Sequence, residues 1–297
     1  MDAATFSPAG YDTDFLELPL RLPAPPAGTI IRDLPYTHFT VLLEPVRRLA
    51  IATGVNIDGD QLVDVDRGDD WHLDPRIPLA EQTGEAVYAN NDLDRGHLVR
   101  RRDPVWGDAT TARQANADTF AYPNAAPQAG EFNQSKALWL GLEDHVLTYA
   151  RTNKNRISVF TAPVLSTDDP VYRGAGVPQS FWKIAAWATT VDGFTLLRAA
   201  GFVLDQRPQL ADIDLDTARA HALIAGTPPP LGPYRSYQVP IVDIAGLTGL
   251  TLDALAAADV LAPVPAIRED AGPRTLWVEL TEISEVRLLS RTDPRPT

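Results

Sequence analysis

The sequence predicts an α+β protein with a mixed, largely antiparallel central sheet and flanking helices. Three apolar stretches, at 39–57, 156–165 and 194–206, have the β-branched, leucine and aromatic content of strands. The stretch 136–150 has a helical period instead. Because these elements do not alternate regularly as strand and helix, the pattern favours an α+β arrangement over a parallel βαβ sheet.

Local patterns justify the individual elements. The stretch 39–57 ends in the turn-forming residues NIDGD, which terminate a strand. In 136–150 an apolar residue recurs every four positions and predicts one buried helix face, at Leu138, Leu142, Val146 and Ala150. A shorter helix is predicted over 251–258, with Thr251 or Asp253 as its N-cap.

Proline placement suggests the domain organisation. The chain has 26 prolines among 297 residues, and several cluster at 18–28, 227–233 and 292–297. Proline fixes φ and lacks an N–H donor, so we expect extended or turning chain there. Neither interior cluster is flanked by a second self-sufficient core. We therefore expect a loose Pro-rich N-terminal arm over 1–35 and a single domain over 36–297.

Composition and charge exclude several classes of protein. The 26 Lys and Arg residues against 39 Asp and Glu give a net charge of −13, which disfavours a protein that coats DNA electrostatically. The absence of cysteine excludes a disulfide scaffold, thiol catalysis and Cys-based zinc sites. No run approaches the roughly 18 apolar residues of a membrane span. No secretory signal is visible, so we expect a cytoplasmic protein or one exported by another route.

The densest polar cluster, NNDLDRGHLVRRRD at 90–103, holds His97 among four arginines: Arg95, Arg100, Arg101 and Arg102. A guanidinium binds phosphate oxygens, and a neutral imidazole accepts a proton near neutral pH. These are two requirements of phosphodiester hydrolysis. Taken alone, however, the cluster fits a solvated charged turn with a structural histidine better.

A second polar group follows in 118–144, where Asn124, Asn133 and Glu143 surround a predicted helix start. An asparagine oxygen suits Mg²⁺, a hard cation that keeps several of its waters. The alternative is that Asn133 caps the helix and Glu143 faces solvent.

Several motifs occur in an order that resembles a known family. DRGH (94–97), NAAPQ (124–128), FNQ (132–134) and WLGLE (139–143) come first. They are followed by FTAPVL (160–165), FWK (181–183), VLDQ (203–206) and RSYQVPIVDIAGLTGL (235–250). From about Tyr36 to Leu250 the chain resembles the DNA/RNA non-specific endonucleases of the ββα-metal, or His-Me finger, fold.

The resemblance implies a role for each matching residue. His97 would be the general base, and Arg95 would contact the phosphate together with Arg100 and Arg101. Asn133 would bind Mg²⁺ directly, with Mn²⁺ as a substitute ion, and Glu143 would hold a metal-bound water. Asn124 would support the catalytic site by hydrogen bonding. The products would carry 5′-phosphates.

Three departures from the family pattern bear on these roles. The ten residues from Asn133 to Glu143 exceed the family spacing. Because ten residues of straight helix rise roughly 15 Å, either Asn133 lies in the loop before the helix or a bulge absorbs the extra length. Ala162 stands where the family has glycine. The family's additional leaving-group arginine corresponds to Arg67 or Arg76, beside the WHLDP element at 71–75, and the sequence does not decide between them.

Other features receive structural interpretations. The acid-rich stretch 58–70 lacks the glycine and glutamate of an EF-hand loop, which favours a solvated turn. Trp71 and the other tryptophans are interpreted as core or site-wall residues, because none is interleaved with a basic run.

The expected partners are DNA and RNA, bound through the phosphate backbone without sequence-specific reading, and no membrane. A homodimer and a protein inhibitor remain open. An unperturbed His97 predicts activity that declines as the pH falls through about 6.5. Two alternative functions are a catalytically silent nucleic-acid-binding protein on the same scaffold and a phosphodiesterase for small substrates.

Overall fold

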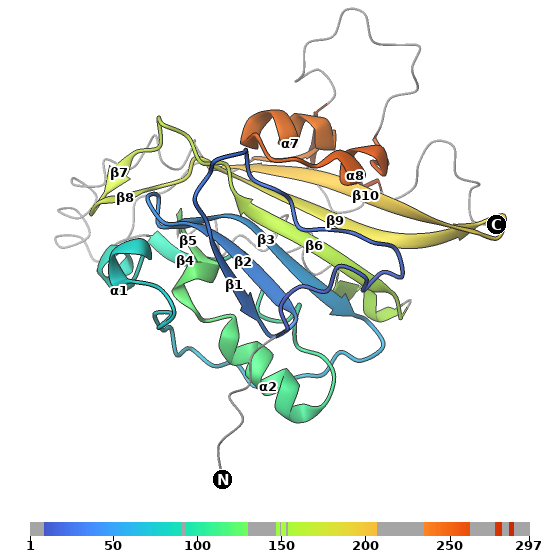
Figure 1. Ribbon diagram of the computed structural model, residues 1–297, viewed down its shortest axis with the longest axis horizontal. Coiled ribbons are helices and arrows are strands. Elements are labelled where there is room, and N and C mark those ends of the chain that lie inside the picture. Colours follow the sequence, from blue (N-terminus) through green and yellow to red (C-terminus); the bar gives the residue numbers. More distant parts are fainter. Residues whose placement is uncertain are drawn as a thin grey trace, which may run out of the picture.

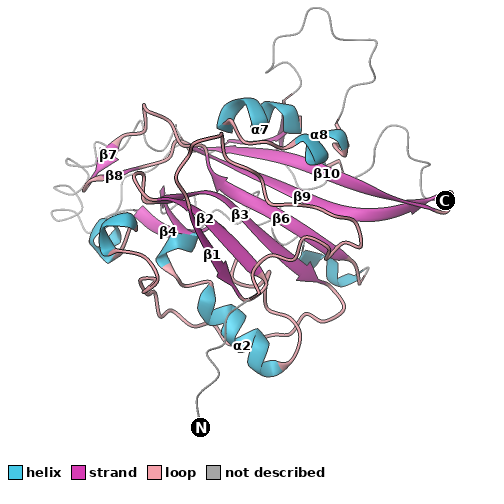
Figure 2. Ribbon diagram, in the orientation of Figure 1, coloured by secondary structure: helices cyan, strands magenta, loops and turns pink. Residues whose placement is uncertain are grey.

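An eight-stranded sheet dominates the computed structural model, which describes residues 9–90, 93–129, 147–148, 150–152, 154–206, 235–261, 277–280 and 285–287 (Figures 1 and 2). The strands, in spatial order, are β1 (Arg32–Tyr36), β2 (Phe39–Glu44), β3 (Leu49–Asp58), β6 (Arg156–Pro163), β9 (Ser180–Val191), β10 (Phe194–Asp205), β11 (Arg235–Val239) and β12 (Val278–Leu280). Every neighbouring pair is antiparallel. The predicted large antiparallel sheet is confirmed, but the parallel pairs implied by a mixed sheet are absent from the described strands.

The predicted apolar stretches form strands of this sheet. The stretch 39–57 folds back on itself as β2 and β3, through a turn in which Arg48 has a φ of 60°. The stretches 156–165 and 194–206 contain β6 and β10. β9 lies between these two strands, and its alternating side chains enter both faces of the sheet.

The first face of the sheet is covered by α7 (Ile241–Thr248) and α8 (Asp253–Ala257), which lie over β10 (Figure 1). Trp182 and Ile184 of β9 pack there with Ile241 and Ile244 of α7. Residues before β1 complete this layer, and four of them are buried in it: Tyr11, Phe15, Leu16 and Leu20. Burial on both faces explains why β9 is apolar from Phe181 to Ala188 at every position except Lys183.

Two sequence expectations are corrected on this face. The segment 9–35 is not a loose arm, because its apolar side chains pack in the core. Strand β1 also runs past residue 35, where the predicted arm was to end. Helix α8 is capped by Leu252 without a side-chain hydrogen bond, not by Thr251 or Asp253. The local sequence offered two good cap residues, but packing of the buried Leu252 and Leu255 sets the start of this helix.

The second face carries the polar cluster on a two-stranded antiparallel ribbon, formed by β4 (Leu93–His97) and β5 (Ala125–Ala129) and connected by residues 98–124. The smaller elements of the chain are η1 (Leu79–Glu81), α1 (Glu85–Tyr88), α2 (Ala109–Asp118), η2 (Tyr122–Asn124), β7 (Val171–Tyr172) and β8 (Ala175–Gly176). Helix α2 begins where the carboxylate of Asp108 accepts hydrogen bonds from the backbone of Thr110 and Thr111. Among the described helices, none is long and apolar enough to cross a membrane.

Most of the predicted helix 136–150 lies outside the described residues. The residues at its described end, 147, 148 and 150, are helical. Leu147 and Ala150 are buried against the second face, as expected for the apolar stripe that includes Ala150.

Candidate active site

His97 and Arg95 lie on the same face of β4. In a strand, side chains two positions apart point to the same side, so the imidazole and the guanidinium are neighbours. The strand is held in register by β5, with Arg95 opposite Pro127 and His97 opposite Ala125. The sequence placed these two groups together, and the strand conformation makes them adjacent in space.

Gly96, between them, is required by packing. A Cβ at this position would lie 2.0 Å from Cδ of Gln128, whose buried side chain covers the glycine. A larger residue at this position would displace the Gln128 side chain from its buried place over β4.

Gln206, directly after β10, anchors the β4–β5 ribbon to the central sheet. The backbone N–H of Ala129 donates to its side-chain oxygen at 3.1 Å, and its side-chain nitrogen donates to the carbonyl of Pro127 at 3.4 Å. The glutamine is fully buried. The VLDQ motif thus ends in a residue that fixes the position of β5, and through it that of His97.

The His97 ring is enclosed by aromatic side chains. Its centroid lies 4.7 Å from that of Trp71 and 5.2 Å from that of Phe120. The buried Nε2 has no hydrogen-bond partner among the residues that the structure describes. Burial, together with the positive charges of Arg67 and Arg101, lowers the pKa of His97 to about 3. The imidazole is therefore neutral at pH 7, the form in which it can accept a proton.

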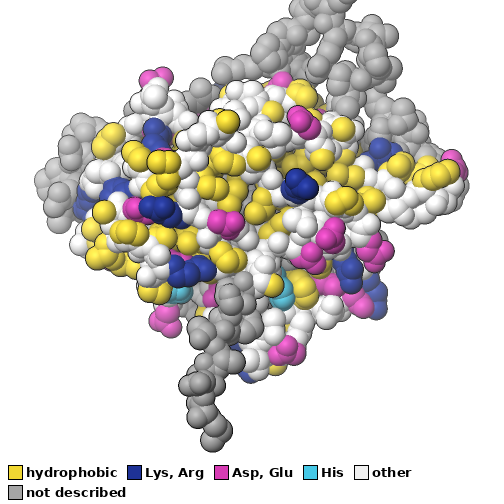
Figure 3. All heavy atoms as spheres, in the orientation of Figure 1, with side chains coloured by type: hydrophobic (Ala, Val, Ile, Leu, Met, Phe, Trp, Pro, Cys, Tyr) yellow, Lys and Arg dark blue, Asp and Glu magenta, His cyan; other side chains and the backbone are white. Residues whose placement is uncertain are grey.

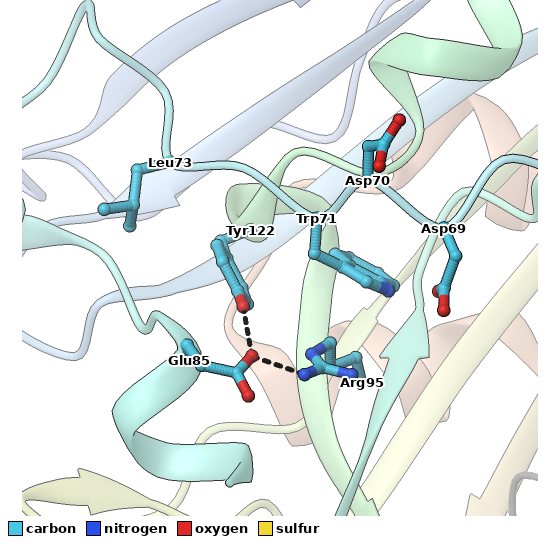
Figure 4. Close-up of a pocket in the computed structure, with 7 residues that line it drawn as sticks. All are labelled: Asp69, Asp70, Trp71, Leu73, Glu85, Arg95 and Tyr122. Carbon is cyan, nitrogen blue, oxygen red and sulfur yellow. Dashed lines mark hydrogen bonds and ion pairs between the residues drawn. The ribbon is translucent and has the colours of Figure 1, made fainter.

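Arg95 is oriented by a partner that sequence reasoning missed. Its guanidinium forms an ion pair with Glu85, whose carboxylate also accepts a hydrogen bond of 2.6 Å from the hydroxyl of Tyr122 (Figure 4). These two contacts, that from Tyr122 foremost, lower the pKa of Glu85. The guanidinium lies 5.9 Å from the Trp71 ring centroid and 5.8 Å from that of Tyr88. Glu85 lies ten residues before Arg95, outside the DRGH motif, and no local pattern marked it.

A cavity of about 500 Å³ opens beside this arginine. Its lining residues, shown in Figure 4, are Asp69, Asp70, Trp71, Leu73, Glu85, Arg95 and Tyr122. Trp71 is both a wall of the cavity and a neighbour of the His97 ring. Trp71 is thus a wall residue of this cavity and is not buried in the main core.

Asn124 is fully buried and bonded to the backbone on both sides. Its oxygen accepts from the N–H of Val99 at 2.8 Å, and its nitrogen donates to the carbonyls of Val99 and Thr119 at 2.9 and 3.0 Å. These contacts fix the chain that follows His97. The Asn124 side chain acts on the site indirectly, by holding the backbone next to His97. Asn124 is therefore a positioning residue.

The remaining arginines are partly engaged within the protein. Arg101 donates to the carbonyl of Val65 at 3.1 Å and to the side-chain oxygen of Asn116 at 2.9 Å. Arg102 forms an exposed ion pair of 2.7 Å with Asp64. Arg100 has polar contacts as well.

The structure distinguishes the two upstream arginines. Arg76 forms an ion pair of 2.6 Å with Asp74 and donates to the carbonyl of Pro35 at 2.7 Å, so it serves the fold. Arg67 is exposed, and its charge contributes to the lowered pKa of His97. Arg67 is therefore the candidate for the additional arginine.

The expected metal ligands Asn133 and Glu143 lie outside the described residues. Within the described part of the chain, no three His, Asp or Glu side chains converge as a metal site.

The sequence profile of the DNA/RNA non-specific endonuclease family matches residues 23–259. A relative from Sinorhizobium fredii, the uncharacterized protein y4fB, is 38% identical over 84% of this chain and 40% of its own length. Mitochondrial endonuclease G from Bos taurus is 32% identical over 32% of this chain and 29% of its own length. The chain thus spans less than half the length of these curated relatives.

The fold resembles that of a chain in the crystal structure of the EndoG/EndoGI complex, a study of EndoG inhibition. The TM-score is 0.53 at 19% identity, and the match covers 74% of this chain and 84% of the other. At that identity the likeness concerns the fold.

Proposed function

Because this chain belongs to the DNA/RNA non-specific endonuclease family, we propose that it hydrolyses phosphodiester bonds in DNA and RNA to give products with 5′-phosphates. The observation that carries the proposal is the pairing of a neutral His97, whose Nε2 has no partner among the described residues, with Arg95 on the same strand face. A nucleic-acid-binding protein without activity needs no neutral imidazole beside a phosphate-binding arginine.

The proposed chemistry assigns one task to each group. Nε2 of His97 takes a proton from water as the water oxygen forms its bond to phosphorus. The bond from phosphorus to the 3′ oxygen breaks, and that oxygen leaves and takes up a proton. Arg95, joined by Arg100 and Arg101, binds non-bridging oxygens and stabilises the charge that develops on the pentacovalent phosphorus.

Arg67 completes this arrangement as the arginine that faces the leaving oxygen. Its positive charge lowers the pKa of His97, which supports a place for Arg67 near the reacting groups. A cation there favours the negative charge that forms on the 3′ oxygen.

We assign the metal to Asn133, as the direct ligand of Mg²⁺ or Mn²⁺, and to Glu143, through a bound water. An amide oxygen as direct ligand, with a carboxylate acting through a bound water, is a suitable donor set for a hard cation that keeps most of its waters. When bound, the ion would polarise the scissile phosphate and stabilise the leaving oxygen.

The proposed partner is nucleic acid, read through its backbone. A protein inhibitor is a further candidate partner, because the solved structural neighbour is a complex of EndoG with EndoGI.

A plasmid-nicking assay tests the function. Supercoiled DNA and a structured RNA are each incubated with the protein in Mg²⁺, with and without EDTA. A small-molecule phosphodiester is assayed in parallel. Cleavage of both polymers that EDTA abolishes supports the proposal. Binding without cleavage would favour the silent protein, and turnover of the small ester alone would favour the phosphodiesterase. Asn133→Ala tests the ligand, since the Mg²⁺ concentration at half-maximal rate should rise.

A further inference from the structure

The cavity beside Arg95 differs chemically from a phosphate-binding groove. Its walls carry the carboxylates of Asp69, Asp70 and Glu85 against the one guanidinium of Arg95. Because the Glu85 carboxylate already balances the Arg95 guanidinium, a second phosphate in this space would face walls with a net negative charge. The part of a substrate that enters it next to a bound phosphate is therefore uncharged.

The remaining walls favour a flat, aromatic ligand. Trp71 and Tyr122 present rings, and Leu73, which is 39% exposed, adds an apolar edge. The volume of about 500 Å³ lies within the roughly 300–1,000 Å³ of small-molecule sites. Among the uncharged parts of a nucleic acid, the base is the one that gains from stacking on such a wall.

The carboxylates supply a means of choosing between bases. Glu85 is already engaged by Arg95 and Tyr122, whereas no hydrogen bond or ion pair involves the Asp69 carboxylate within the described residues. In Figure 4 the Asp69 side chain points to the side of the cavity where Trp71 and Arg95 lie. A carboxylate only accepts hydrogen bonds, so it selects a ligand that has a donor.

We propose that this cavity receives the nucleobase next to the scissile phosphate, stacked against Trp71, and that Asp69 favours bases with an exocyclic amino group. Guanine, adenine and cytosine carry that donor, and thymine and uracil lack it. The inference rests on the proposed function. It adds a nucleobase preference to an enzyme that otherwise recognises only the sugar-phosphate backbone.

Single-stranded oligonucleotides with one ordinary phosphodiester among methylphosphonate linkages test the preference. Two comparisons are made at the nucleotide on each side of that linkage. Guanine is compared with hypoxanthine, which lacks the 2-amino group, and adenine is compared with unsubstituted purine, which lacks the 6-amino group. On one side of the linkage, kcat/KM should be about fivefold to tenfold higher for the amino-bearing base in at least one of the two comparisons.

Two matched variants assign the effect to one carboxylate. Asp69→Ala removes the acceptor and should abolish the ratio, while Asp66→Ala, at an exposed aspartate of the same loop that does not line the cavity, should preserve it. Equal rates for both pairs on both sides in the unaltered protein would overturn the inference. So would a ratio that survives in Asp69→Ala.

The same oligonucleotides are titrated against His97→Ala in Ca²⁺ by fluorescence anisotropy, which measures the base preference without cleavage. If the unaltered protein cleaves no polymer but this variant still binds the amino-bearing base more tightly, the proposed function fails and the cavity's preference stands. If cleavage occurs and neither assay finds a preference, the inference fails alone.

Discussion

The imidazole of His97 packs against the indole of Trp71, with ring centroids 4.7 Å apart and planes inclined by 48°. This contact helps to remove the ring from water, and loss of hydration disfavours the charged form of a histidine. The same indole is a wall of the cavity beside Arg95. Trp71 thus helps to set the protonation state of His97, the proposed general base. It also borders the proposed nucleobase-binding cavity.

The first prediction concerns pH. A general base acts in its neutral form, which prevails above its pKa, and burial with Arg67 and Arg101 lowers the pKa of His97 to about 3. Activity should therefore persist as the pH falls through 6.5, where an unperturbed histidine would already be half protonated. The measurement is kcat/KM from pH 4 to 8 at saturating Mg²⁺. A half-loss near pH 6.5 would show that His97 titrates as a solvated histidine.

The second prediction is that His97→Ala lowers cleavage by about 10²- to 10⁴-fold, the typical cost of losing a general base. Substrate binding in Ca²⁺ should change little, because Arg95 and its partner Glu85 are untouched. Single-turnover cleavage and anisotropy measure the two quantities separately. A variant that retains more than about a tenth of the rate would end the assignment.

The third prediction separates Arg67 from Arg76. Removing a positive neighbour raises the pKa of a histidine, so Arg67→Gln should move the acid limb of the pH profile to higher pH and lower kcat. Arg76→Gln is the matched control. It breaks the partly exposed ion pair with Asp74 and should cost about 1–2 kcal/mol of unfolding free energy, with no shift of the profile. A shifted profile in Arg76→Gln alone would reverse the assignment.

The fourth prediction concerns Asn124. Asn124→Ala removes three hydrogen bonds to the backbone of Val99 and Thr119 and leaves buried polar groups without partners. The free energy of unfolding should fall by about 2–4 kcal/mol. Urea denaturation measures that loss. At low temperature, where the variant stays folded, the acid limb of its pH profile should match that of the unaltered protein, since Asn124 does not touch the reacting groups.

The fifth prediction concerns salt. Arg95, Arg101 and Arg102 each have partners within the protein, which limits the number of phosphates they can neutralise. On the face shown in Figure 3, basic side chains are scattered among hydrophobic and acidic ones and form no continuous stripe. The log–log slope of duplex DNA affinity against NaCl, measured in Ca²⁺, should be about −2 to −3. A slope steeper than about −5 would reveal an extended basic groove.

Local sequence predicted much of the framework. Apolar stretches predicted β2, β3, β6 and β10, because a strand inside a sheet needs apolar side chains wherever a face is covered. The DRGH motif placed His97 and Arg95 two positions apart. The structure shows that this segment is a strand, and the period of a strand makes such residues neighbours.

Other features depended on contacts that no local pattern contains. The segment 9–35 looked like a free arm by its prolines, but its aromatic and leucine side chains pack in the core. Glu85, Tyr122 and Trp71 come from three separate segments and meet at Arg95 only in the folded chain.

The sequence by itself determined which groups could take part in the chemistry: an imidazole and a set of guanidinium groups. The tertiary structure decided which strand carries them and what state they are in. Trp71 and Phe120 enclose His97, and burial with the charges of Arg67 and Arg101 keeps it neutral. Arg76 is already paired with Asp74, and for that reason we propose Arg67 as the additional arginine. A pKa depends on burial and on charges brought near from distant parts of the chain, and only folding brings them there.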